Sequence, residues 1–153
     1  MEFKELNIKP YHVQDIKLKN RYVEFGKLIS ELKLREIPSD IIDSVNRDIE
    51  DINSFSGSTK DSLKQLKKAK SGILNLIEKE LKLVPKNTYQ TRWMVIGMSG
   101  FGIPLGVAFG VSIGNMAFLG AWIPIGLAIG IAIGAGMDKK AFQEGRQLDM
   151  EIK

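Results

Sequence analysis

One long stretch of the chain has no charged residue. From Trp93 to Met137 there are 45 residues without Asp, Glu, Lys, Arg or His, and every charge lies in the two flanks. As one straight helix this stretch would extend about 68 Å, whereas the hydrocarbon core of a bilayer is about 30 Å thick and is crossed by about 20 residues. The segment is therefore expected to cross a membrane twice, as a helical hairpin.

The two spans are expected at about residues 93–113 and 119–137, with residues 114–118 as the turn. The alternative is a hairpin buried in the core of a soluble protein. The other 108 residues are too few and too polar to cover two helices that are apolar on all sides, so the membrane hairpin is favoured.

The flanks of the segment predict its orientation. Basic residues precede the first span and follow the second, whereas the turn between the spans has no charge. By the positive-inside rule, both ends of the hairpin face the cytosol. The residues expected to anchor the spans at the membrane interfaces are Arg92, Trp93, Trp122, Lys139 and Lys140.

Glycine recurs every fourth residue in both spans. A spacing of four places these glycines on one face of each helix, where the missing side chains allow another helix to approach to backbone contact. The residues expected to form the packing faces are Gly102, Gly106, Gly110 and Gly114 in the first span and Gly126, Gly130 and Gly134 in the second. The faces could pack on each other within one hairpin or on a neighbouring hairpin.

The two spans also repeat one pattern, since residues 100–114 and 120–134 are identical at eight of fifteen positions. Each copy contains a proline, Pro104 or Pro124, which lacks a backbone donor and crowds the carbonyl four residues earlier. A kink is therefore expected in both spans. Ser99 or a water could satisfy the freed carbonyls, which is favoured, or the carbonyls could line a passage.

Three amphipathic stretches precede the hairpin. Their apolar stripes consist of Leu18, Tyr22, Phe25, Ile29 and Leu32, of Ile42, Val45, Ile49 and Ile52, and of Leu63, Leu66, Ile73, Ile77, Leu81 and Val84. Ser39 and Ser58 can cap the second and third helices. Pro38 and Pro85 should end the first and third. The stripes predict a shared core; the alternative is a face kept open for a partner helix or for coiled-coil assembly.

Together these patterns predict an all-α protein with four parts. Residues 1–12 are expected to be an irregular lead-in, and residues 13–86 an amphipathic three-helix cytosolic bundle or hairpin. Residues 87–137 should form the glycine-zipper transmembrane hairpin, and residues 138–153 a charged cytosolic tail.

The sequence contains no constellation typical of an enzyme. The single histidine, His12, has no metal-ligand partner at helical spacing, and there is neither a nucleophile motif nor a glycine-rich loop after a strand. Cysteine is absent, which excludes thiolate ligands and a lipid-modified cysteine. We therefore predict no catalytic, cofactor-binding or metal-binding residues.

The basic excess of the chain suggests possible partners. All of the net charge of +4 arises before Trp93. Lysines near a membrane contribute about 1 kcal/mol each when held at an anionic surface, so lipid headgroups are a possible partner. The basic residues run from Lys60 to Lys86 and on to Arg92. Asp61, Glu78 and Glu80 interrupt this run, which favours a solvated helix face. Nucleic acid is not expected, because no binding motif or aromatic platform accompanies the charge.

The double glycine pattern, with the sequence from Gly136 to Lys140 that follows it, resembles the glycine-zipper two-helix domains of small bacterial membrane proteins. The likeness covers about residues 90–150 and implies a packing mode, not an activity. The first residues contain no apolar signal region. We expect a multi-pass protein of the bacterial inner membrane with both termini in the cytosol.

Two functions remain open at this point. In the first, the hairpin is a membrane anchor that self-associates through its glycines and presents a helical module to a cytosolic protein partner. In the second, several hairpins form a pore or a membrane-permeabilising complex. The only polar side chains in the spans and their turn are Ser99, Ser112 and Asn115, and no charged ring is present, so the anchor is favoured.

Overall fold

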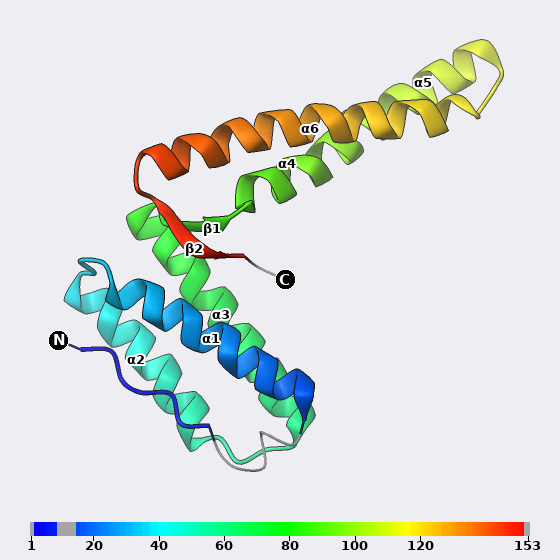
Figure 1. Cartoon of the computed structure of the whole chain (residues 1–153). Coiled ribbons are helices and arrows are strands. Elements are labelled where there is room, and N and C mark those ends of the chain that lie inside the picture. The colour runs from blue at the N-terminus through cyan, green and yellow to red at the C-terminus, as the bar shows by residue number, and fades with distance from the viewer. Residues whose placement is uncertain (1, 9–14, 152–153) are drawn as a thin grey trace. The chain divides into compact units, whose positions relative to one another are not determined.

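The computed structural model describes residues 2–8 and 15–151. The elements in chain order are α1 (Ile16–Lys33), α2 (Ser39–Ser54), α3 (Thr59–Leu81), β1 (Val84–Lys86), α4 (Thr88–Gly97), a π-helical turn (Met98–Gly102), α5 (Ile103–Ile113), α6 (Phe118–Gln143) and β2 (Gln147–Glu151) (Figure 1). The chain divides into two compact units, Met1–Leu83 and Val84–Lys153.

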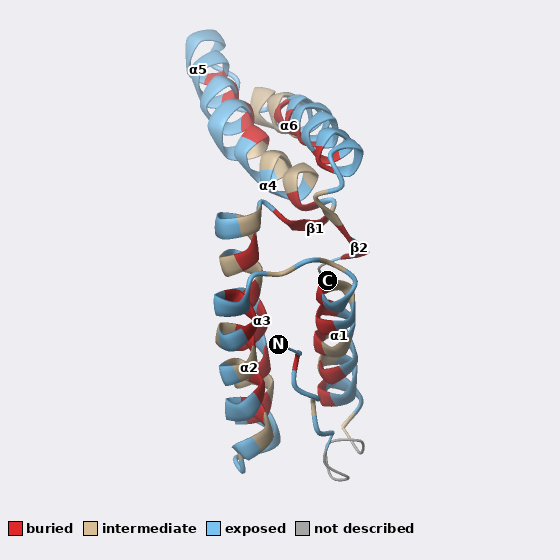
Figure 2. Cartoon of the chain, turned by 90° about the vertical axis from the view of Figure 1, so that its left-hand side faces the viewer, coloured by how far each residue is buried: buried red, intermediate tan, exposed pale blue. Residues whose placement is uncertain are grey.

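The first unit is built from the three predicted amphipathic helices. Helix α3 packs against both α1 and α2. The apolar stripes face inward, as the red segments of these helices in Figure 2 show. Fully buried side chains come from every helix: Leu18, Tyr22, Phe25, Leu28 and Leu32 from α1, Val45 and Ile49 from α2, and Ile73 and Ile77 from α3. The shared core is therefore confirmed.

The ends of these helices agree only partly with the predicted ones. Ser58 caps α3, and its Oγ accepts a hydrogen bond from the backbone N–H of Asp61 (3.3 Å). The prediction that Ser39 caps α2 is wrong by one residue, because Pro38 occupies the cap position and its carbonyl accepts the N–H groups of the first turn. Helix α3 ends at Leu81, ahead of the predicted limit, since Lys82 adopts a left-handed conformation with φ 56°.

The lead-in is described only in part. Residues 2–8 form neither helix nor strand and run along α2 (Figure 1). His12 lies outside the described residues.

A buried cation ties α1 to α3. Lys70, which is 8% exposed, donates from Nζ to Glu24 Oε2 (2.8 Å), and Arg21 Nη1 donates to the same oxygen (2.9 Å). Burial raises the pKa of the Glu24 carboxyl, but the hydrogen bonds and charges of Lys70 and Arg21 outweigh it, so this pKa lies below its ordinary value. Linkage then makes these ion pairs stabilising above the unfolded pKa, and this stability is lost as the pH falls through the lowered folded pKa.

Replacing Glu24 with Gln should destabilise the first unit by about 1–3 kcal/mol at neutral pH, because Lys70 loses its carboxylate while it stays buried. Urea unfolding followed by circular dichroism measures the change, and the difference should shrink as the pH falls. Glu80→Gln is the control, since its ion pair with Lys79 is exposed and contributes less than about 1 kcal/mol. Equal midpoints for the two variants at neutral pH would contradict the assignment.

The second unit is a helical hairpin closed at its base by two short strands. Helix α4, the π-helical turn and α5 form one helical run that packs against α6. The described chain thus has the predicted helical fold, three helices followed by two long apolar helices packed as a hairpin. Strands β1 and β2 pair in parallel, with Val84 opposite Gln147 and Pro85 opposite Leu148. This small sheet is absent from the sequence prediction.

The sheet joins the segments that precede and follow the hairpin. Pro85 lies in β1 and does not end a helix. The first residues of the charged tail, 138–143, belong to α6. Helix α6 continues to Gln143, and β2 follows after a short turn at Gly145, where φ is +69°.

Candidate membrane-spanning hairpin

Both helical runs of the hairpin are long and apolar enough to cross a membrane. They extend over Thr88–Ile113 and Phe118–Gln143, 26 residues each. Many of their large apolar residues are exposed, as the pale blue parts of these ribbons in Figure 2 show. They include Phe101, Leu105, Val107, Phe109 and Val111 on the first run and Ile125, Ile129, Ile131 and Ile133 on the second. Two helices that are apolar all round are suited to a lipid environment.

Glycines line the contact between the two runs. A β-carbon added at Gly130 would lie 2.7 Å from the carbonyl carbon of Trp93, and one added at Gly126 would lie 2.6 Å from the backbone nitrogen of Gly102. At Gly134 the same test meets the carbonyl oxygen of Tyr89 at 2.6 Å. In the half of the hairpin nearer the two strands, the helices therefore approach to backbone contact.

The contact is looser toward the turn. A β-carbon at Gly102 would lie 3.1 Å from the Cα of Ile123, and one at Gly106 would lie 3.0 Å from that of Leu119. At Gly110 the nearest atom is the side-chain sulfur of Met116, at 3.0 Å, which can move. Five of the seven predicted packing glycines thus face the opposite helix of the same hairpin, and Gly110 faces the turn at Asn115 and Met116.

Gly114 has a different place from the predicted one, and Gly97 takes a place that the spacing of four did not indicate. Gly114 ends α5 with φ +70° and has no atom within 4 Å of an added β-carbon. Gly97 faces the backbone of Gly126 and Gly130. It precedes Gly102 by five residues, and the π-helical turn between them, with its i→i+5 bonds, keeps both on one face.

The two repeated prolines have different surroundings. Pro104 stands in the first turn of α5, directly after the π-helical turn, where Ile103 N–H bonds to the Met98 carbonyl. Pro124 lies inside α6, which stays α-helical through it. The hydroxyl of Ser99 donates to the Val95 carbonyl (2.8 Å), and that of Ser112 to the Ala108 carbonyl (2.7 Å), so both serine side chains bond to their own helix.

A carboxylate from α6 caps the start of α4. Asp138 is 6% exposed, and its Oδ1 and Oδ2 accept the backbone N–H groups of Tyr89 (3.2 Å) and Gln90 (2.8 Å). The first N–H groups of a helix have no partner within it and carry partial positive charge, so a carboxylate at this position is favourable. In the sequence, Asp138 was noted only within the stretch from Gly136 to Lys140 that carries the family resemblance. Its spacing did not indicate a capping role.

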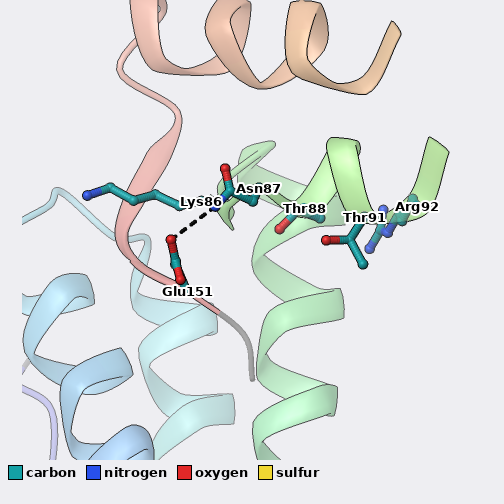
Figure 3. Close-up of a pocket in the computed structure, with 6 residues that line it drawn as sticks. All are labelled: Lys86, Asn87, Thr88, Thr91, Arg92 and Glu151. Atoms are coloured by element: carbon teal, nitrogen blue, oxygen red, sulfur yellow. Dashed lines mark hydrogen bonds between the residues drawn. The ribbon is translucent and has the colours of Figure 1, made fainter. Parts of the chain in front are cut away.

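Further bonds close the base around Asp138. Asn87 has a left-handed φ of 58°, which turns the chain from β1 into α4. The Thr88 hydroxyl donates to the Pro85 carbonyl (2.8 Å), and Asn87 Nδ2 donates to Glu151 Oε1 (3.0 Å), the dashed line of Figure 3. Lys86 pairs with Asp149, and this hydrogen bond lowers the pKa of the Asp149 carboxyl.

An open pocket of about 320 Å³ lies at this base. Its lining residues are Lys86, Asn87, Thr88, Thr91, Arg92 and Glu151 (Figure 3). The Arg92 cation, the Glu151 carboxylate and several polar groups thus line the point where the first apolar run begins, while the Lys86 ammonium turns away and pairs with Asp149.

The remaining predicted anchors lie toward the two ends of the hairpin. Trp93 is near the base, where its backbone faces Gly130, and Lys139 and Lys140 are exposed in the last turns of α6. Trp122 is in the second turn of α6, near the tip, and stacks on Phe109 with ring centroids 4.8 Å apart.

No protein family, curated protein or solved structure matches the chain. Within residues 2–8 and 15–151, no three His, Asp or Glu side chains gather as metal ligands would.

Proposed function

We propose that the chain is an integral membrane protein of the bacterial inner membrane, whose hairpin anchors a helical interaction module at the cytosolic face. The observation that carries this proposal is the hairpin itself. Its two 26-residue helices contact each other through glycines and leave their large apolar side chains exposed. In lipid, close backbone packing holds helices together while apolar side chains face the acyl chains.

The paired strands support a topology with both ends on one side. Strand β1 directly precedes the first apolar run and β2 follows the second, and the two are hydrogen-bonded. Strands on opposite sides of a bilayer could not pair. The basic residues near this base, including Arg92, Lys139 and Lys140, favour the cytosolic side under the positive-inside rule.

The same residues support contact with anionic lipid headgroups. Lys86 and Arg92 line the pocket at the base, and Lys139 and Lys140 are exposed. Basic side chains held close to the surface of an anionic leaflet gain about 1 kcal/mol each.

Self-association is part of the proposal, but the glycine faces are occupied within one hairpin. We therefore assign the glycines first to closure of the hairpin. Contacts between hairpins would use the outward faces, where Gly100, Gly120 and Gly136 have open space around an added β-carbon. A pore is less well supported than an anchor, because Ser99 and Ser112 bond to their own helix carbonyls.

Labelling of single cysteines tests the topology. The chain has no cysteine, so Lys60→Cys, Ala117→Cys and Gln143→Cys each introduce one exposed thiol. In intact cells, a membrane-impermeant maleimide should label only the Ala117→Cys variant, at the tip of the hairpin. The other two should label after lysis, which serves as the control for reactivity. Labelling of Lys60→Cys or Gln143→Cys in intact cells would overturn the orientation.

A further inference from the structure

Two asparagines of α2 hold the extended segment of residues 2–8 by its backbone. The Asn46 amide accepts from the N–H of Lys4 (2.8 Å) and donates to the carbonyl of Glu2 (3.1 Å). The Asn53 amide does the same three residues further on, with the N–H of Asn7 (2.8 Å) and the carbonyl of Glu5 (2.9 Å). Each side-chain amide thus pairs with the segment as a neighbouring strand would.

The spacing of this pair matches an extended chain. Asn53 follows Asn46 by seven positions, which is about 10.5 Å along a helix at 1.5 Å per residue. Three residues of an extended segment advance about 10 Å at 3.3–3.4 Å each. Two turns of α2 therefore place the amides of Asn46 and Asn53, here called the amide clamps, at the spacing of every third residue of an extended peptide. Because the clamps bond only to backbone groups, they do not depend on the side chains of that peptide.

Side chains add specificity to the clamps. Phe3, between the two backbone groups that Asn46 holds, is 9% exposed, and a pocket beside it is lined by Ile37 and Ile42. Leu6, between the groups that Asn53 holds, is half-buried. Lys4 pairs with Glu50 of α2. The bound segment thus places on α2 an aromatic residue, a cation directly after it and an aliphatic residue three positions after the aromatic one.

We propose that this surface of α2, the asparagine groove, is a docking site for an extended segment of a partner protein, with residues 2–8 bound in it as an internal competitor. The partner segment carries the chemistry of the present occupant: an aromatic side chain, then a cation, then an aliphatic side chain. This inference rests on the proposed role of the helical unit as an interaction module, and it names what that module binds.

The present occupant is held weakly enough to be displaced. Only Phe3 is buried in the segment, Ile8 is 47% exposed, and the ion pair of Lys4 is at the surface. Exposed ion pairs and single hydrogen bonds contribute little each. A tethered segment nevertheless acts at an effective concentration of the order of millimolar, so it masks the groove from dilute ligands.

Peptide binding tests the proposal on the full chain in detergent. The probe is a fluorescent peptide with the sequence of residues 2–8, and the readout is anisotropy. A variant lacking residues 2–8 should bind the probe at least tenfold more tightly than the intact chain, because the competitor is gone. Phe3→Ala, which keeps the whole chain but removes the one buried side chain of the segment, should fall between them.

The clamps have their own controls. N-methylation of the probe at Lys4 and Asn7 removes the two N–H donors and should weaken binding at least tenfold. N-methylation at Glu5, whose N–H makes no hydrogen bond to the described part of the chain, should not. In the protein, Asn46→Ala and Asn53→Ala should each reduce binding, while Asn20→Ala on the exposed face of α1 should leave it unchanged.

Three results with the probe would overturn the proposal: no binding to a folded chain that lacks residues 2–8, equal binding to that chain and the intact one, or equal loss for all N-methylated probes. A fourth would do the same: if Phe3→Ala chains form dimers with intact chains but do not bind the free probe, the occupant is a second copy of this chain. These results do not depend on membrane crossing, which the cysteine labelling tests separately.

Discussion

Gly130→Ala is expected to loosen the hairpin, although it adds a single methyl group. The new carbon would lie 2.7 Å from the carbonyl carbon of Trp93 and 3.0 Å from the Cα of Met94. Both are backbone atoms, so the clash cannot be relieved by a rotamer change and the helices must separate. Overpacking of a close contact costs about 1–3 kcal/mol, which changes the ratio of packed to open hairpin roughly tenfold or more. Leu at this position should be worse.

Positions in the same hairpin supply the matched controls. Gly136→Ala lies on α6 and meets no atom within 4 Å, so it should be neutral or slightly stabilising, because Ala favours the helix over Gly. Gly110→Ala should have an intermediate effect, since its nearest neighbour is the movable sulfur of Met116. Leu in place of Val107 adds one methylene on an exposed face, and Leu in place of Ile131 changes the shape of an exposed side chain at constant volume.

Tryptophan fluorescence during an SDS titration measures hairpin opening, because Trp93 and Trp122 are the only tryptophans and both lie in the hairpin. Native gels of the same samples report on oligomers. If Gly130→Ala unfolds at the same SDS fraction as Gly136→Ala, the glycines are not a packing surface.

Asp138→Ala is expected to open the base of the hairpin. Two backbone N–H groups, those of Tyr89 and Gln90, lose their acceptor at a buried site. Loss of a helix cap costs about 0.5–2 kcal/mol, and an unsatisfied buried donor costs about 1–3 kcal/mol. Asp138→Asn keeps one acceptor oxygen and should be milder.

Amide hydrogen exchange localises this effect. The amides of Tyr89 and Gln90 should exchange about tenfold faster or more in Asp138→Ala, while those at the centre of α6 change little. Asp149→Asn is the control, because it removes a carboxylate at the same base that takes part in an exposed ion pair with Lys86. Unchanged exchange at the start of α4 would show that Asp138 does not support it.

The parts of the fold that follow from local periodicity could be predicted from the sequence. The apolar stripes that include Phe25, Ile49 and Ile73 fix which face of each helix is buried, and the absence of charge from Trp93 to Met137 fixes the hairpin. Glycine spacing indicated five contact positions because an α-helix returns to the same face about every fourth residue.

What could not be predicted depends on contacts between distant residues or on a local change of helix type. The packing position of Gly97 could be predicted only with knowledge of the π-helical turn. The capping role of Asp138 could be predicted only with knowledge that α4 packs against α6. Strand β2 did have a local pattern, since Leu148 and Met150 alternate with polar residues and are buried. Its partner β1 has only three residues, too few to show a period.

The lead-in illustrates the same limit. Residues 2–8 have no period of their own, because their order comes from Asn46 and Asn53, more than forty residues away. Asn46 lies in the middle of α2, where asparagine is unfavourable for helix propensity, and this was an available sign that its side chain bonds elsewhere.

The π-helical turn between Gly97 and Gly102 makes this point of the first span tolerant to a change in chain length. Deleting one residue from the stretch between these two glycines would bring them to a separation of four, the repeat of an ordinary α-helix, and both would still face α6. Elsewhere in the span, an insertion or deletion rotates every following glycine by about 100° away from its contact. A chain that is one residue shorter at this point would therefore keep the rest of the hairpin in place.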